Sequence, residues 1–232
     1  MSNLSPTVAH AKPLRSDGAE ARSRLLEAAL ALFAEKGFAK TSTREIALAA
    51  QVNIAAISYY FGDKAGLYRA VWMDPRCNPE CWRPSAADDA PSLEQAVTGT
   101  LRSFIEPIKQ GPLMQQCMKL HFREMLEPTG VWQEEIDTHI KPAHLALVAV
   151  LCRHLGLAGA DDAIHRLGFS IAGLGIMLHI GSDVITAVRP QLLESHSALD
   201  TYGDQLVGYA MALVDAEARR RSPQNPTKKT PQ

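Results

Sequence analysis

The chain has 232 residues, of which 46% are hydrophobic, 21% charged and only 6% aromatic. The formal net charge is −1, which excludes a molecule that attracts nucleic acid through its overall charge. The charge is nevertheless unevenly distributed: residues 10–72 hold nine basic and six acidic side chains, and the rest of the chain carries a net charge of −4. We therefore expect a polyanion to meet the N-terminal part first.

The two ends of the chain and its cysteines indicate where the protein works. Residues 1–17 hold prolines and small residues without periodicity, and residues 222–232 are rich in Pro, Lys and Gln. We expect a flexible arm and a disordered tail. The first residues lack the apolar core of an export signal, and the chain has four cysteines. A reducing, cytoplasmic setting follows from this pattern.

Residues 167–188 form one segment that is about long enough to cross a bilayer. The segment contains Ser170, His179 and Asp183, and a central carboxylate is unfavourable in lipid. We interpret the segment as a buried helix of a soluble protein, and we expect no membrane partner.

A series of helical patterns follows the arm, with Ala and Leu dominant and no strict alternation typical of exposed strands. The first pattern ends at Gly37, as a helix does at a C-terminal glycine, and hydroxyl residues before the second provide a cap. Gly62 and Asp63 separate the third from the fourth. We expect helices over residues 19–36, 43–50 and 54–61, and a fourth from Lys64, within a domain at 18–73.

The remaining chain predicts a second, larger helical domain over residues 74–221. Residues 74–91 hold four prolines and two cysteines and suit a connection. Pro142 predicts a kink or break within one long pattern. We expect helices over residues 92–110, 112–127, 129–155, 161–188 and 199–219. The fold class is therefore all-α, with two domains.

Two short helices joined by a tight turn, after a longer helix, are typical of a helix-turn-helix unit. An α-helix fits the major groove, and the helix before it touches phosphates with its N-terminus. Any small helical bundle shows similar spacing, so the pattern alone leaves a non-DNA function open.

The residues themselves add to the pattern. Residues 43–47, 52–64 and 67–68, which read TREIA, VNIAAISYYFGDK and LY, resemble the TetR family of bacterial repressors. The resemblance covers residues 22–72 and implies phosphate contacts from the helix-2 threonine and its neighbour and from the lysine that opens helix 4. It implies base contacts from helix 3. The DNA-binding residues would be Thr43, Arg44, Asn53, Ala55, Ala56, Tyr59, Tyr60 and Lys64. Thr43 could also cap its helix.

One departure points to a narrower branch of that family. Many members have tyrosine where this chain has Ser58. The strings NIAAISYYFG at residues 53–62 and REMLEPTG at residues 123–130 are similar to CecR-like regulators. The resemblance implies a dimer on a palindromic operator and a C-terminal domain that senses a small molecule, with repression relieved by the ligand as the family default.

The C-terminal helices contain a heptad-like run that suits a homodimer. Small residues between its members permit close helix approach, and two helices from each subunit would give a four-helix interface. An ordinary monomer core would show the same pattern. The apolar positions are Leu167, Ile171, Leu174, Leu178, Ile185 and Val188 in one helix and Leu199, Leu206, Tyr209 and Leu213 in the other.

A stripe of methionine, aromatic and histidine residues predicts a pocket for an apolar or amphipathic effector. The proposed lining is Met118, His121, Phe122 and Met177, because polar groups interrupt an adaptable apolar surface. Plain core packing explains the same stripe. Arg123 and Glu124 also fit a structural ion pair.

Other classes of protein match less well. Cys77 and Cys81 could hold zinc in a metal-responsive regulator, but Pro79 lies between them and no second pair follows. Phosphate loops, nucleophile elbows and metalloprotease signatures are lacking, so we expect neither an enzyme nor a cofactor. A helical adaptor that does not bind DNA stays open.

Overall fold

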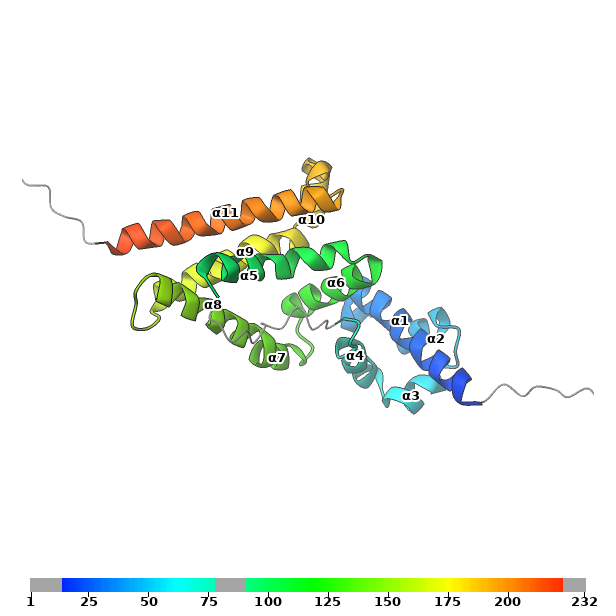
Figure 1. The fold of residues 1–232 in the computed structure, drawn as a ribbon. Helices are drawn as coiled ribbons and strands as arrows, with labels where there is room; N and C mark the ends of the chain where they lie inside the picture. Colours follow the sequence, from blue (N-terminus) through cyan, green and yellow to red (C-terminus); the bar gives the residue numbers. More distant parts are fainter. Residues whose placement is uncertain (1–13, 78–90, 223–232) are drawn as a thin grey trace, which may run out of the picture. The chain divides into compact units, whose positions relative to one another are not determined.

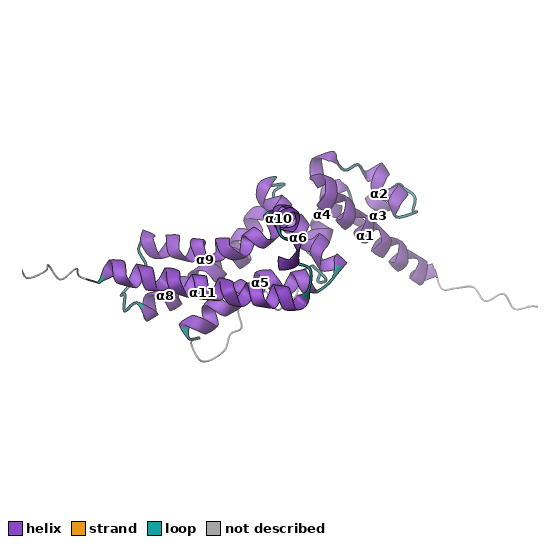
Figure 2. Ribbon diagram, turned by 90° about the horizontal axis from the view of Figure 1, so that it is seen from above, coloured by secondary structure: helices purple, strands orange, loops and turns teal. Residues whose placement is uncertain are grey.

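The computed structural model describes residues 14–77 and 91–222, and all regular structure within these ranges is helical. The chain divides into two compact units, Met1–Asp74 and Pro75–Gln232. Figure 1 follows the chain through both units, and Figure 2 shows that helices joined by short loops make up each of them. The expected all-α class is confirmed.

The first unit consists of four helices. Gly37 interrupts the first with a left-handed φ of 79°, as predicted, but helical hydrogen bonding resumes for three more residues. The first helix also begins within the segment expected to be a flexible arm, so that expectation is wrong for residues 14–17. The helices are α1 (Leu14–Lys40), α2 (Thr43–Ala49), α3 (Ala55–Phe61) and α4 (Lys64–Trp72).

An aromatic cluster joins α1 to α4. The ring of Tyr68 meets the rings of Phe33 and Phe38 edge-on, at centroid distances of 4.9 and 5.2 Å. Such pairs add about 0.5–1.5 kcal/mol to the stabilisation from apolar burial. Ile46 of α2 and Ile57 of α3 are fully buried in the same unit. The core therefore fixes which faces of the two short helices remain in solvent.

The second unit is a helical bundle in which α5, α9 and α11 pack along one another (Figures 1 and 2). Its buried core draws on α5, α8, α9 and α11, and Leu101, Leu151, Ile164 and Ile171 are fully enclosed. The α-helices are α5 (Leu93–Lys109), α6 (Pro112–Leu126), α7 (Trp132–Glu135), α8 (Lys141–His154), α9 (Asp162–Ile180), α10 (Ser182–Val188) and α11 (His196–Arg221).

Two expected helices are divided. A π-helical turn at Ile136–Ile140 separates α7 from α8, just before Pro142, whose missing N–H and ring disfavour a regular helix there. The predicted break at Pro142 is thus confirmed. Gly181 separates α9 from α10, which the periodicity of residues 161–188 did not predict.

The α9 helix is the one described helix that is long and apolar enough to cross a membrane. Its apolar composition has another cause, because α9 contacts α5, α8 and α11 and buries Ile164, Ile171 and Leu178. Most of the heptad-like run of this segment therefore lies inside the subunit's own core. Leu167, Ile171 and Leu178 of the predicted dimer seam are therefore core residues, whereas Val188 is exposed.

One disulfide is present among the described residues: Cys77 is bonded to Cys117 of α6. Cys152 is a buried free thiol, and Cys81 lies outside the described residues. The bond differs from the reduced cysteines expected from the sequence. It also occupies Cys77, one of the two thiols considered for zinc.

Candidate nucleic-acid interface

The start of α2 is built around a serine cap. The Ser42 hydroxyl accepts a hydrogen bond from the Glu45 backbone N–H at 3.1 Å, and the Glu45 carboxylate pairs with Lys36 of α1. Ser42, and not Thr43, is therefore the cap, and the capping role predicted for Thr43 is wrong. Thr43 occupies the first turn with a half-buried side chain, beside an exposed Arg44. Both remain available to a phosphate near this helix end.

The orientation of α3 follows from one buried residue and one cap. Ile57 is 1% exposed and holds the helix against the core. The Asn53 side-chain oxygen accepts a hydrogen bond from the Ala55 N–H at 2.9 Å, so Asn53 supports the start of the helix and keeps only its amide NH₂ for a base. Ala55 and Tyr59 are exposed, and Ala56 is half-buried.

The start of α4 places a lysine at the same unit's surface. Asp63 caps the helix by accepting the Gly66 N–H at 2.7 Å. Gly66 is required there, because a Cβ would lie 2.0 Å from the Phe61 carbonyl oxygen. The Lys64 ammonium lies 4.3 Å from the centre of the Phe38 ring, and partial burial lowers its pKa. The ring face thus holds the ammonium in place by a cation–π contact.

The two predicted tyrosines differ in their surroundings. Tyr59 is 82% exposed, and its ring meets that of Tyr60 at 4.9 Å. The Tyr60 hydroxyl is 3.1 Å from the place where a Cβ on Gly18 would stand. Tyr60 therefore lies against α1, and Tyr59 is the more accessible of the pair.

Two exposed aliphatic side chains beside these residues were not among the predicted ones. Leu48 of α2 is 78% exposed and Ile54, directly before α3, is 50% exposed. Ile54 neighbours Ala55 and is long enough to extend the apolar surface of α3 toward a thymine methyl. The signal in the sequence was an isoleucine at the solvent-exposed start of a helix in which Ile57 already provides the core-facing side chain.

The residues predicted to bind an effector lie in the second unit, and three of the four share α6. Met118 and His121 are buried, and Phe122 stacks on His179 of α9 with ring centroids 4.6 Å apart. Met177 instead lies on a partly exposed side of α9, 44% exposed. The structure thus brings His179, which the predicted lining did not include, to Phe122.

Buried titratable groups surround this stripe. Burial lowers the pKa of His121, whose ring nitrogen donates to the Cys117 carbonyl at 3.0 Å. Burial also lowers the pKa of His179, which donates to the Phe104 carbonyl at 2.7 Å. Glu124 is fully buried and accepts the Thr129 N–H at 2.6 Å. The apolar stripe is therefore interrupted by neutral imidazoles and by a carboxylate that is hydrogen-bonded to Thr129.

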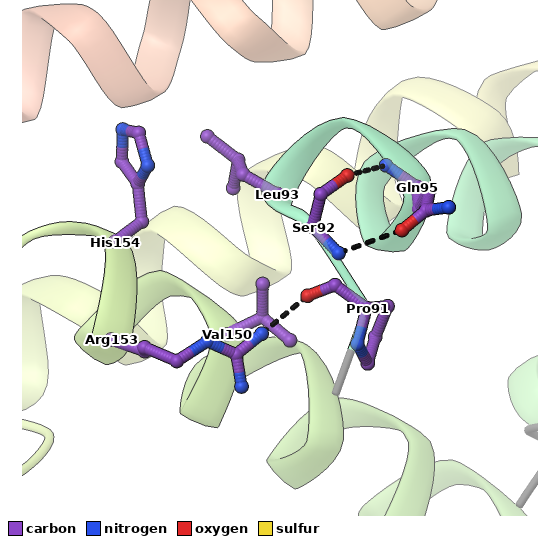
Figure 3. Close-up of a pocket in the computed structure, with 7 residues that line it drawn as sticks. All are labelled: Pro91, Ser92, Leu93, Gln95, Val150, Arg153 and His154. Atoms are coloured by element: carbon purple, nitrogen blue, oxygen red, sulfur yellow. Dashed lines mark hydrogen bonds between the residues drawn. The ribbon is translucent and has the colours of Figure 1, made fainter. Parts of the chain in front are cut away.

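A separate hollow of about 490 Å³ lies between the start of α5 and the end of α8. In Figure 3, Arg153 reaches from α8 to the Pro91 carbonyl, and Ser92 and Gln95 form the reciprocal cap of α5. Because the polar groups of the cap are satisfied by each other, they offer little to a ligand. The hollow shares no residue with the predicted effector lining.

An exposed apolar stripe runs along α9 and α10. From Met177 on, its members recur every three or four residues, Phe169 lies two turns before Met177 with Gly173 between them, and α11 adds two exposed members. A Cβ at Gly173 of α9 or at Gly208 of α11 would meet nothing within 4 Å, so both glycines are open to close approach by another helix. The exposed side chains are Phe169, Met177, Ile180, Val184, Val188, Tyr209 and Leu213.

Comparison with known proteins gives two family matches that together cover most of the chain. Bacterial regulatory proteins of the tetR family match residues 25–71. The C-terminal domain of the HTH-type transcriptional dual regulator CecR matches residues 93–213. CecR of Shigella flexneri is 30% identical over 180 residues, which cover 72% of this chain and 79% of that protein.

Solved structures share the fold at low sequence identity. The structure of AibR in complex with isovaleryl coenzyme A and operator DNA superposes with a TM-score of 0.60 and 20% identity, covering 82% of this chain and 97% of that chain. HlyIIR, a hemolysin II transcriptional regulator, superposes with a TM-score of 0.55 and 20% identity, covering 83% and 97%.

Proposed function

Because the chain belongs to the TetR family of bacterial regulators and is of the CecR-like type, we propose that it represses transcription as a homodimer on a palindromic operator and is released by a small effector. The observation that carries the proposal is the exposed surface of α2 and α3, which presents Arg44, Asn53, Ala55 and Tyr59 on a well-packed unit. A regulator of this kind acts in the cytoplasm, where the DNA is.

The DNA contacts divide into two kinds. Thr43, Arg44 and Lys64 bind phosphates, since they stand at helix starts with a hydroxyl or a cation, and phosphate contacts position a protein without reading sequence. The α3 surface reads bases in the major groove. Alanines permit close approach, and their methyl groups suit a thymine methyl. The base-reading residues are Asn53, Ala55 and Ala56, with Tyr59 and Tyr60 at the edge of the groove.

The effector in this proposal is apolar or amphipathic and lodges along α6. Met118 and Phe122 supply adaptable apolar contacts, and His121 and His179 orient polar groups as neutral imidazoles. AibR, which shares the fold, was crystallised with isovaleryl coenzyme A, an amphipathic molecule, together with operator DNA.

The dimer in this proposal uses the exposed apolar stripe of α9 and α10 together with Tyr209 and Leu213 of α11. Burying such side chains against a second copy contributes about 25 cal/mol per Å² of apolar surface. Open glycines at positions 173 and 208 allow the helices of two subunits to approach closely. A dimer also supplies the paired recognition helices that read two half-sites about 34 Å apart.

Release from DNA is a shift between two populations. An effector that binds one arrangement of the second unit more tightly favours that arrangement. The chain passes from α4 into the second unit at residue 74, so a change there alters the spacing of the two DNA-binding units. A few kcal/mol of differential affinity suffices to change operator occupancy.

The direct test is a mobility-shift titration with DNA from upstream of the protein's own gene. We expect a discrete complex that survives excess unrelated DNA and disappears when a matching amphipathic effector is added. Binding that is equal on unrelated DNA would contradict the operator. A protein that binds no DNA at low salt would support a helical adaptor instead.

A further inference from the structure

We propose that Cys77 and Cys117 form an oxidant-responsive pair whose disulfide restricts the DNA-binding unit and weakens operator binding. The inference rests on the proposed function. Its starting observation is the bond between a cysteine in the turn after α4 and a cysteine in the middle of α6. Disulfides in cytoplasmic proteins of mesophiles are usually transient, catalytic or redox-sensing.

The position of the bond allows it to constrain the connection between the two units. In the sequence, 20 residues, 73–92, separate the end of α4 from the start of α5. Once Cys77 is bonded to α6, only residues 73–76 separate α4 from a fixed point of the second unit. Oxidation therefore lowers the number of residues between α4 and the nearest covalent attachment to the second unit's helices from 20 to four, which reduces the freedom of the DNA-binding unit. Two DNA-binding units that must adjust to two half-sites lose that freedom.

The same bond touches the proposed effector stripe. Cys117 lies one residue before Met118, and its carbonyl accepts the hydrogen bond from His121. The covalent link thus joins the chain leaving α4 to the helical turn that carries these two side chains. A thiol pair at this place is therefore suited to change the regulator's response.

The reaction balances with a peroxide as oxidant. One thiolate attacks a peroxide oxygen, giving a sulfenic acid and releasing water from hydrogen peroxide, and the second thiolate then attacks that sulfur and releases a second water. Two thiols and one peroxide thus give one disulfide and two waters. Both sulfurs belong to residues at most 1% exposed, so the reaction and its reversal by small thiols require local opening of the turn. The disulfide is therefore long-lived once formed.

The test uses full-length wild-type protein, reduced with dithiothreitol or oxidised with stoichiometric hydrogen peroxide. Peptide mapping should find Cys77 linked to Cys117 only after oxidation. The oxidised protein should melt about 10 °C higher, because the link closes a long loop. In mobility-shift titrations it should bind the operator about tenfold more weakly than the reduced protein.

Variants separate the link from general damage. Cys77→Ser and Cys117→Ser should keep the affinity of the reduced protein after peroxide, whereas Cys152→Ala should respond as the wild type does. A disulfide that involves Cys81 or Cys152, or equal operator affinity of both redox forms, would overturn this inference and leave the proposed function intact. A reduced protein that binds no operator would overturn the proposed function and, with it, the effect on DNA. The melting shift and the peptide map are read independently of DNA.

Discussion

Thr41 and Thr43, which only Ser42 separates, have different roles in this molecule. Thr41 is 2% exposed, and its hydroxyl donates to the carbonyls of Gly37 and Leu32, so it closes the end of α1. Thr43 stands two residues later with a half-buried side chain in the first turn of α2, which Ser42 caps. The sequence showed three consecutive hydroxyl residues, and we assigned the cap to Thr43 where the structure has Ser42. Only the packing of α1 against α2 assigns one to the core, one to the cap and one to the surface.

Substitution of each threonine should give opposite results. Thr43→Ala should weaken binding to all DNA sequences alike and reduce the slope of affinity against salt by about one phosphate contact, with an unchanged melting temperature. Thr41→Ala should lower the free energy of unfolding by about 1 kcal/mol and leave the DNA affinity of the folded protein intact. Salt titrations and thermal melts on both variants check this. A change of base preference in Thr43→Ala would exclude a phosphate contact.

Three histidines with a lowered pKa predict an acid-sensitive second unit. Burial lowers the pKa of His121, His144 and His179, so between those values and the ordinary value near 6.5 the unfolded chain binds more protons than the folded one. Stability therefore falls as the pH drops below about 6.5 and is flat above it. Urea unfolding at pH 5.5 and 7.5 should show the loss.

His179→Gln should reduce that loss. Equal pH dependence in wild type and His179→Gln would show that His179 does not contribute. Carboxylates are not expected to dominate in this pH interval, because their ordinary pKa values lie near 4.

At the scale of elements, predictions from local chemistry were the most accurate. Gly37 was expected to end the first helix and does adopt a left-handed φ, and Pro142 was expected to break a helix and follows a π-helical turn. The break at Gly181 was missed because the apolar periodicity runs through it. The heptad-like run was misinterpreted because Leu167, Ile171 and Leu178 would look the same whether they faced a second subunit or their own core.

The register of α3 gives a sharp test at this scale. Ala55→Gln places a longer hydrogen-bonding side chain on the exposed face, opposite the buried Ile57. We expect a changed preference at one or two operator positions, each by about 1–3 kcal/mol, with a melting temperature near that of the wild type. Selection of bound sequences from a random DNA library measures this. A collapse of the melting temperature would mean that Ala55 faces the core.

At the scale of the whole molecule, the proposed dimer uses an exposed surface of which the sequence singled out only Val188, Tyr209 and Leu213. Some apolar residues of α9 face the core and others form the exposed stripe. The apolar periodicity of the sequence included both sets and could not separate them. Gly173 lies within the stripe with open space around it, so a larger side chain there disturbs no contact within the subunit. A substitution at Gly173 therefore tests assembly of the dimer without disturbing the folding of the subunit.

Gly173→Glu should therefore convert the dimer into folded monomers and lose operator binding at the same time, because a carboxylate in an apolar interface is desolvated without a partner. Gly99 of α5 is also exposed in a helix with no atom near its Cβ position, and Gly99→Glu should remain dimeric and bind DNA. Sedimentation at micromolar concentration distinguishes the two. A dimeric Gly173→Glu would move the interface to another surface.

The measurement that tests the central claim most directly is the mass of the complex on a single operator duplex. The operator is first selected from a random library with the reduced wild-type protein, and sedimentation then gives the number of protomers bound. We predict a palindromic sequence with half-sites about one helical turn apart and two protomers bound cooperatively. A single protomer on the selected duplex, or a library without enrichment of any sequence, would contradict a dimeric operator-binding regulator.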